Sequence, residues 1–178
     1  GNQSDEPIVM TNEDARERLR GIADLLLLHD RDIYMRCDDS VTRVLDGAPR
    51  PMRRARGYVP VPVFLRDPVP CVLGVGAELK NTVCLTRGRE AFLSQHIGDL
   101  ENLETLRSFE HTIAHLKRIL EVEPECIVHD LHPDYLNTQW ALRQTGVRLL
   151  AVQHHHAHIA SVMAERRLDG PAIGLALD

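Results

Sequence analysis

The sequence predicts an α/β fold in which helices pack against a sheet. Two patterns indicate this class. Two short apolar segments, 71–75 and 83–85, flank a turn and predict a β-hairpin. After residue 101, segments with helical periodicity alternate with short apolar segments, an order that is typical of layered α/β proteins. The 178 residues are enough for one domain of ordinary size or for two small ones.

The N-terminal part of the chain is expected to hold one helix and two short strands. A helix is predicted over 11–30, because Thr11 or Asn12 can cap it and apolar residues recur at helical spacing. Two short strands are expected within 32–47. Four prolines then predict an extended connector over 58–70, and we place a domain boundary there.

The C-terminal part is expected to alternate strands and helices along its whole length. After the hairpin, the predicted elements are a strand, a helix, a strand, a helix, a strand, a helix and a strand. In that order they cover residues 90–97, 102–122, 125–130, 132–146, 147–153, 155–168 and 172–177. Helix 102–122 has the clearest amphipathic pattern. Gly146 is expected to end the helix over 132–146.

The composition is that of a folded protein, with 43% hydrophobic and 26% charged residues. A net charge of -5 gives no support for a general nucleic-acid-binding surface. The four cysteines form no C-x-x-C pair, so a zinc ribbon is not expected. Scattered cysteines, with neither a signal peptide nor a membrane-spanning run in the sequence, lead us to expect a cytoplasmic protein.

A run of histidines, HHHAH at 154–158, is the most unusual feature of the sequence. It follows the strand expected over 147–153, and open α/β sheets bind ligands at the carboxyl ends of their strands. His154 and His158 share one face of a helix and can bind one metal ion. With Asp178 as a third ligand, such a set suits iron or zinc. The alternative is a solvated polar helix start, and the spacing alone does not decide between them.

Two other segments combine polar groups with expected strand ends. His129, Asp130 and His132 lie at the end of one expected strand, either as a ligand-facing loop or as a helix cap with structural hydrogen bonds. The hairpin turn carries Lys80, which suits either phosphate binding or a simple chain reversal.

A cluster of arginines lies between the two parts of the chain. Arg54 and Arg56 are candidates to clamp a phosphate group, and Asn2 and Ser4 are candidates to hydrogen-bond a nucleotide. The alternative interpretation is a solvated basic stretch beside a domain boundary.

Seven segments occur in the same order in the HypF family, the carbamoyltransferases of hydrogenase maturation. They are GNQSDEPI, HDRDIYMRCDDSV, RRARGYVP, GAELKNTVCL, SQHIGDLEN, HDLHPDY and VQHHHAHIASVMAE. The chain resembles this family over essentially its whole length, and the pair HDLHPDY and VQHHHAH is highly specific. The resemblance therefore favours the metal site over the polar helix start.

The resemblance also implies an arrangement of domains. Residues 1–60 are similar to the end of a YrdC-like, nucleotide-binding α/β domain, and 61–69 to a proline-rich linker. Residues 70–178 are similar to the first part of a Kae-type carbamoyltransferase domain, an α/β fold of the actin and sugar-kinase class. Proteins of the family are much longer, so the chain is expected to be an internal fragment.

By resemblance, the complete enzyme uses carbamoyl phosphate and ATP, with Mg²⁺, to form carbamoyl adenylate. It then transfers the carbamoyl group to the C-terminal cysteine of HypE, the first step toward the cyanide ligands of nickel–iron hydrogenases. The resemblance makes His154, His158 and Asp178 the metal-binding and catalytic residues. It assigns nucleotide or carbamoyl contacts to the following residues: Asn2, Ser4, Arg54, Arg56, Lys80 and Asn81.

Two other functions are compatible with these observations. A threonylcarbamoyl transferase acting on transfer RNA is the nearest alternative enzyme, although the negative charge and the HypF-type segments disfavour it. The fragment is also compatible with a protein that binds metal and docks a partner without catalysis.

Overall fold

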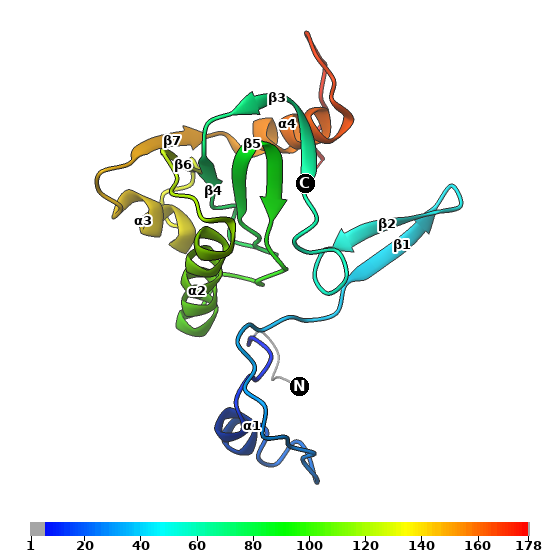
Figure 1. Cartoon of the computed structure of the whole chain (residues 1–178), viewed down its shortest axis with the longest axis vertical. Helices are drawn as coiled ribbons and strands as arrows, with labels where there is room; N and C mark the ends of the chain where they lie inside the picture. Colours follow the sequence, from blue (N-terminus) through cyan, green and yellow to red (C-terminus); the bar gives the residue numbers. More distant parts are fainter. Residues whose placement is uncertain (1–5, 178) are drawn as a thin grey trace.

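The computed structural model describes residues 6–177 and confirms the α/β class (Figure 1). Its main body is a five-stranded sheet with the strand order β3-β5-β4-β6-β7. The strands are β3 (Val63–Val69), β4 (Val72–Gly74), β5 (Cys84–Leu93), β6 (Cys126–Asp130) and β7 (Arg148–Val152). Strands β4, β6 and β7 are parallel, whereas β5 pairs antiparallel with both β4 and β3.

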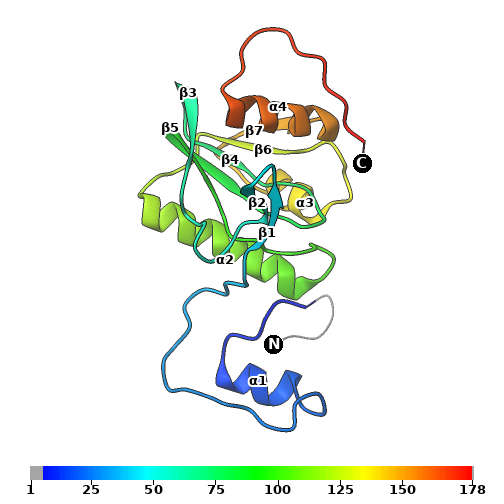
Figure 2. The same ribbon diagram turned by 90° about the vertical axis from the view of Figure 1, so that its right-hand side faces the viewer.

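Helices cover both faces of the sheet (Figure 2). They are α2 (Leu103–Leu120), α3 (Leu136–Leu142) and α4 (His154–Arg166). Helices α2 and α3 lie on one face and α4 lies on the other. Phe109 of α2 is fully buried and packs edge-on against Trp140 of α3, with ring centroids 5.2 Å apart. The core therefore lies between the sheet and these two helices.

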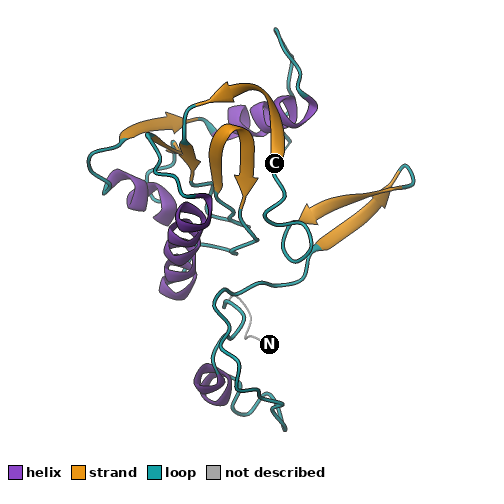
Figure 3. Ribbon diagram, viewed as in Figure 1, coloured by secondary structure: helices purple, strands orange, loops and turns teal. Residues whose placement is uncertain are grey.

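Residues before β3 form a separate, loop-rich region (Figure 3). It contains helix α1 (Asn12–Arg18) and a hairpin of β1 (Val41–Leu45) and β2 (Ala48–Arg53). The hairpin forms a sheet of its own and extends away from the main body. In the part of the chain that the structure describes, no helix combines the length and the apolar character needed to cross a bilayer.

The helix predicted over 11–30 is wrong beyond its first two turns. Its start is as expected, because the Thr11 side chain accepts a hydrogen bond from the Asp14 N–H, 3.0 Å away. The helix ends at Arg18, shortly before Gly21, which has a φ of +80°. The following leucines meet no core, and Leu27 is completely exposed. Helical spacing without a surface to pack on does not sustain a helix.

Three predicted strands also differ from the structure. Only one strand, β1, forms within 32–47; its partner β2 takes in part of the arginine-rich stretch. The strand expected over 90–97 is the end of β5, which doubles back at Gly88 so that the Ser94 N–H bonds the Val83 carbonyl. Residues 172–177 form no strand, because no described strand pairs with them.

The connector predicted over 58–70 is partly correct. Its backbone is extended, but Val63–Val69 is hydrogen-bonded to β5 as the edge strand β3. Pro68 is tolerated there because an edge strand has one side without ladder hydrogen bonds. The domain boundary at 61–69 stays a prediction.

Candidate functional site

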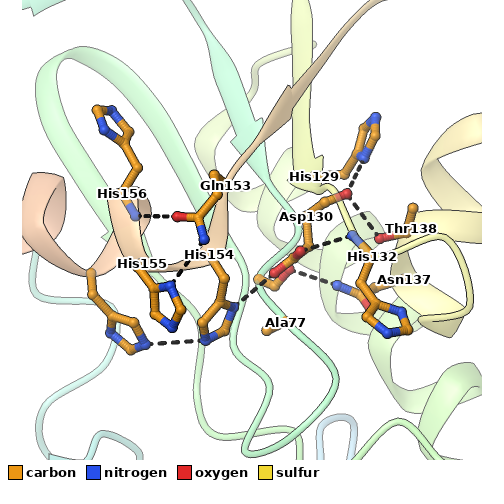
Figure 4. Close-up of polar contacts among 12 residues, drawn as sticks. Ala77, His129, Asp130, His132, Asn137, Thr138, Gln153, His154, His155 and His156 are labelled. Atoms are coloured by element: carbon orange, nitrogen blue, oxygen red, sulfur yellow. Dashed lines mark hydrogen bonds and ion pairs between the residues drawn. The ribbon is translucent and has the colours of Figure 1, made fainter. Parts of the chain in front are cut away.

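The candidate site lies where β6 and β7 end side by side (Figure 4). These parallel strands are in register, so that Asp130, the last residue of β6, is paired with Val152, the last residue of β7. Helix α4 begins two residues later with His154, and the Gln153 side chain caps it by accepting from the His156 N–H, 2.8 Å away. The histidine run is therefore held beside the end of β6.

His154 and His158 face each other across one turn of α4, as their spacing predicts. Their Nε2 atoms are 3.1 Å apart, and their ring centroids are 4.8 Å apart. Two nitrogens bound to one zinc ion are separated by roughly 2.9 to 3.3 Å, given metal–nitrogen bonds of about 2.0–2.1 Å and angles between 90° and tetrahedral. The separation of the two nitrogens therefore suits two ligands of one divalent ion.

Asp130 joins the two segments of the site. Its Oδ2 is 2.8 Å from Nδ1 of His154, and its Oδ1 accepts a hydrogen bond from the His132 N–H at 2.9 Å. The Asp130 side chain is only 8% exposed, whereas that of His154 is 35% exposed. The segment HDLH is thus both a loop-forming element and part of the site, which combines the two interpretations that its sequence left open.

A cavity of about 370 Å³ opens beside the histidines. Its walls are the loop between β4 and β5, the ends of β6 and β7, and the side of α4 that carries His154 and His158. None of the described lining residues is a cysteine. Burial raises the pKa of the Cys84 thiol to about 11, so this cysteine is no source of thiolate at neutral pH.

The loop opposite the histidines is held by two buried asparagines. Asn81 Nδ2 donates to the carbonyls of Val75 and Ala77, at 2.9 and 2.6 Å. Asn137 Nδ2 donates to the carbonyls of Val75 and Gly76, at 3.2 and 2.6 Å. The sequence suggested a ligand contact for Asn81, whereas the structure gives its amide nitrogen a role in fixing the cavity wall.

Lys80 lies on a different cavity, of about 260 Å³, between the N-terminal region and the main body. Arg36, Arg53 and His96 also line it, so it is rich in nitrogen donors. The Lys80 N–H donates to Asp99 Oδ1, and the residue has a φ of +50°. The structure thus separates Lys80 from the histidine site.

The two predicted arginines lie away from the histidines and have other partners. Arg54 donates to the carbonyls of Tyr58 and Val61, at 3.1 and 2.8 Å, and so stabilises the turn before β3. Arg56 is largely exposed, with Nε 3.9 Å from Asp39 Oδ1. Asn2, Ser4 and Asp178 lie outside the described residues. Their predicted roles, and those of the two arginines, stay predictions.

Over residues 6–177, no cluster of three or more His, Cys, Asp or Glu side chains has the arrangement of a complete metal site. The structure describes two of the three predicted ligands, His154 and His158. Asp130 does not replace the third, because it contacts Nδ1 of His154, on the opposite side of the ring from Nε2.

Comparison with known proteins decides the family. A family model for the HypF Kae1-like domain matches residues 67–165. The chain belongs to the HypF family. It is 55% identical, over 99% of its length, to carbamoyltransferase HypF2 of Cupriavidus necator and, over the same share, 55% identical to carbamoyltransferase HypF of Rhizobium leguminosarum bv. viciae. It spans 23% of the length of each of these relatives.

Two solved HypF structures have the same fold as this chain. A crystal structure of full-length HypF in the phosphate- and nucleotide-bound form matches with a TM-score of 0.95 and 49% identity, covering 100% of this chain and 28% of that one. The structure of T. kodakarensis HypF matches with a TM-score of 0.89 and 43% identity, covering 95% of this chain and 22% of that one. The family resemblance and the fold class deduced from the sequence are therefore confirmed.

Proposed function

We propose that this chain supplies one wall of a HypF-type carbamoyl-transfer site, in which His154 and His158 bind a divalent iron or zinc ion. The observation that supports this most strongly is the approach of the two Nε2 atoms to 3.1 Å inside a cavity at the ends of β6 and β7. Membership of the HypF family supports the choice of carbamoyl transfer over other metal-dependent reactions.

In the proposed reaction, the complete enzyme hydrolyses carbamoyl phosphate to carbamate and phosphate. It then joins the carbamate to ATP, with Mg²⁺, giving carbamoyl adenylate and pyrophosphate. The C-terminal cysteine of a HypE-type protein then attacks the carbamoyl carbon. A sulfur–carbon bond forms, AMP leaves, and the thiol proton is lost. Because no cysteine of the described wall lines the cavity, an acceptor thiol from a partner is compatible with this scheme.

Each part of the cavity has a task in this proposal. A bound divalent ion supplies positive charge that orients the substrate and polarises its carbonyl group. The two histidines hold that ion, and Asp130 holds one of the histidines. The asparagine-braced loop keeps the opposite wall at a fixed distance. The four free thiols are compatible with a cytoplasmic location, which we include in the proposal.

The metal site is tested by elemental analysis of the purified chain beside a His154→Ala/His158→Ala double variant. We expect close to one iron or zinc ion per wild-type chain and a clear loss in the variant. A His155→Ala/His156→Ala variant is the matched control, because it removes the same number of histidines from the same helix. Equal metal content in all three chains would contradict the proposed ligands.

The reaction is tested in a complete HypF protein that carries this segment. Carbamoyl-phosphate-dependent exchange of labelled pyrophosphate into ATP reports adenylate formation, and mass spectrometry of HypE reports transfer. We expect the double variant to retain exchange and to lose transfer, because the histidines belong to the second step. Loss of neither activity would favour a docking role, and a gel shift with transfer RNA would favour the transfer-RNA-modifying alternative.

A further inference from the structure

We propose that Asp130 is a positioning residue that fixes the tautomer of His154 and thereby leaves Nε2 of that ring available to a metal ion. This inference deepens the proposed function and rests on it for the metal. The tautomer itself is a property of the protein without metal, so the two ideas can be tested separately.

The hydrogen bonds around Asp130 determine where the imidazole hydrogen lies. A carboxylate oxygen accepts hydrogen bonds and has no hydrogen to donate. Oδ2 is 2.8 Å from Nδ1 of His154, so Nδ1 is the donor in this pair. A neutral imidazole carries one ring hydrogen, and Nε2 therefore keeps its lone pair. That lone pair is directed toward Nε2 of His158, 3.1 Å away.

The same contacts indicate which nitrogen atoms would hold a metal ion. In the protein without metal, the short contact between the two Nε2 atoms needs one hydrogen, and His158 must supply it because Nε2 of His154 has none. A divalent ion would take the place of this shared hydrogen and be held by both nitrogens, and the ring hydrogen of His158 would then lie on its Nδ1. A metal-bound histidine commonly donates its other ring N–H to a carboxylate, and Asp130 occupies that position for His154.

Asp130 is itself held firmly in place. Its side chain is almost completely buried at the end of β6, and its second oxygen accepts from the His132 N–H at 2.9 Å. Its backbone carbonyl accepts from the Thr138 hydroxyl and is 2.7 Å from His129 Nδ1 (Figure 4). The carboxylate therefore cannot rotate away from His154 without breaking another hydrogen bond.

This second hydrogen bond makes Asp130→Asn an informative variant. The amide oxygen of the new side chain must take the position of Oδ1, because only an oxygen accepts from the His132 N–H. The amide NH₂ then faces His154 Nδ1 and donates to it. Nδ1 becomes an acceptor, and the ring hydrogen moves to Nε2. The substitution thus keeps the shape of the site but removes the lone pair that would bind the metal.

The experiment measures the tautomer and the metal affinity in the same chains. Two-dimensional ¹⁵N–¹H NMR of the metal-free protein, in an alkaline buffer where histidines are neutral, identifies which nitrogen of His154 carries hydrogen. Titration with zinc chloride in a calorimeter gives the affinity. Asp134→Asn is the matched control, because it makes the same chemical change at an exposed position of the same loop.

We expect the Nδ1–H tautomer in the wild-type and Asp134→Asn proteins and the Nε2–H tautomer in Asp130→Asn. Zinc affinity should fall about 10- to 100-fold in Asp130→Asn alone, the usual effect of losing such a partner. An Nε2–H tautomer of His154 in the wild-type protein would overturn the proposal, and that measurement needs no variant to fold. An unchanged tautomer in a folded Asp130→Asn protein would also overturn it.

Zinc binding separates this inference from the proposed function. If the tautomers are as expected but the wild-type chain binds no zinc, the role of Asp130 toward His154 stands and the proposed metal site fails. If zinc binds tightly and equally to all three proteins, the metal site stands and the role of Asp130 fails.

Discussion

Replacing Gly76 by alanine tests how closely the cavity wall is packed. Gly76 has a φ of +69°, a conformation that costs an L-residue about 1–2 kcal/mol. A Cβ there would overlap the carbonyl oxygen of Thr82 and lie 2.8 Å from Nδ2 of Asn81. Relieving such an overlap in a packed region typically costs about 1–3 kcal/mol. The two effects together predict that Gly76→Ala lowers the free energy of unfolding by roughly 2–5 kcal/mol.

Two other glycines separate the two effects. Gly88 has a φ of +60° and open space around it, so Gly88→Ala should show only the conformational cost, about 1–2 kcal/mol. Gly74 lines the same cavity, but a Cβ there meets Cys84 at an ordinary 3.9 Å, and its backbone is outside the left-handed region. Gly74→Ala should therefore change the free energy of unfolding by less than about 1 kcal/mol.

Urea unfolding followed by circular dichroism measures all three variants against the wild-type chain. The expected order of destabilisation is Gly76→Ala, then Gly88→Ala, then Gly74→Ala. Equal losses for Gly76→Ala and Gly88→Ala would show that the loop yields to an added methyl group, and the steric argument would be wrong. A loss of roughly 2–5 kcal/mol is a large part of the 5–15 kcal/mol that is usual for a folded domain, so the difference is measurable.

Two further predictions concern the core and the pH dependence. Phe109→Ala should lower the free energy of unfolding by about 3–5 kcal/mol, because it empties a fully buried site against Trp140, and Phe109→Leu should cost clearly less in the same urea assay. Burial, and then the charge of Arg53, lowers the pKa of His96 in the folded protein. Below about pH 6.5 the unfolded chain then binds more protons at this site, so stability decreases as the pH falls below that value. His96→Asn should make the unfolding free energy less dependent on pH over this range, and an unchanged slope would exclude His96 as a cause.

The sequence predicts the main body of the fold well because its elements bury a large apolar surface. Helix α2 and strands β6 and β7 form within two residues of their expected limits. The N-terminal region is predicted poorly, since its apolar residues keep helical spacing but stay exposed, as Leu25 and Leu27 do. The antiparallel pairing of β5 with β3 could not be predicted either, because no local pattern in the sequence reveals it.

Part of the candidate site is also predictable from the sequence. The i, i+4 spacing places His154 and His158 on one face of a helix, whatever surrounds that helix. The role of Asn81 could not be predicted, because its partners are backbone carbonyls whose direction depends on the fold of the loop. The position of Lys80 also depends on the fold of this loop: it is next to Asn81 in the sequence, but it lines the cavity between the N-terminal region and the main body, and its contact to a nucleotide or carbamoyl group stays a prediction.

The contact between Asp130 and His154 could be predicted from the order of strands and helices in the sequence, although not from the distance between the two residues along the chain. The two residues are 24 positions apart, but Asp130 is the last residue of one short apolar strand and His154 comes two residues after the end of another. The helix between those strands makes them parallel neighbours. Parallel neighbours end at the same edge of a sheet, so the polar residues that follow them are brought together. A search for partners of His154 at the end of β6, the strand beside β7, and not only among the other histidines, therefore identifies Asp130.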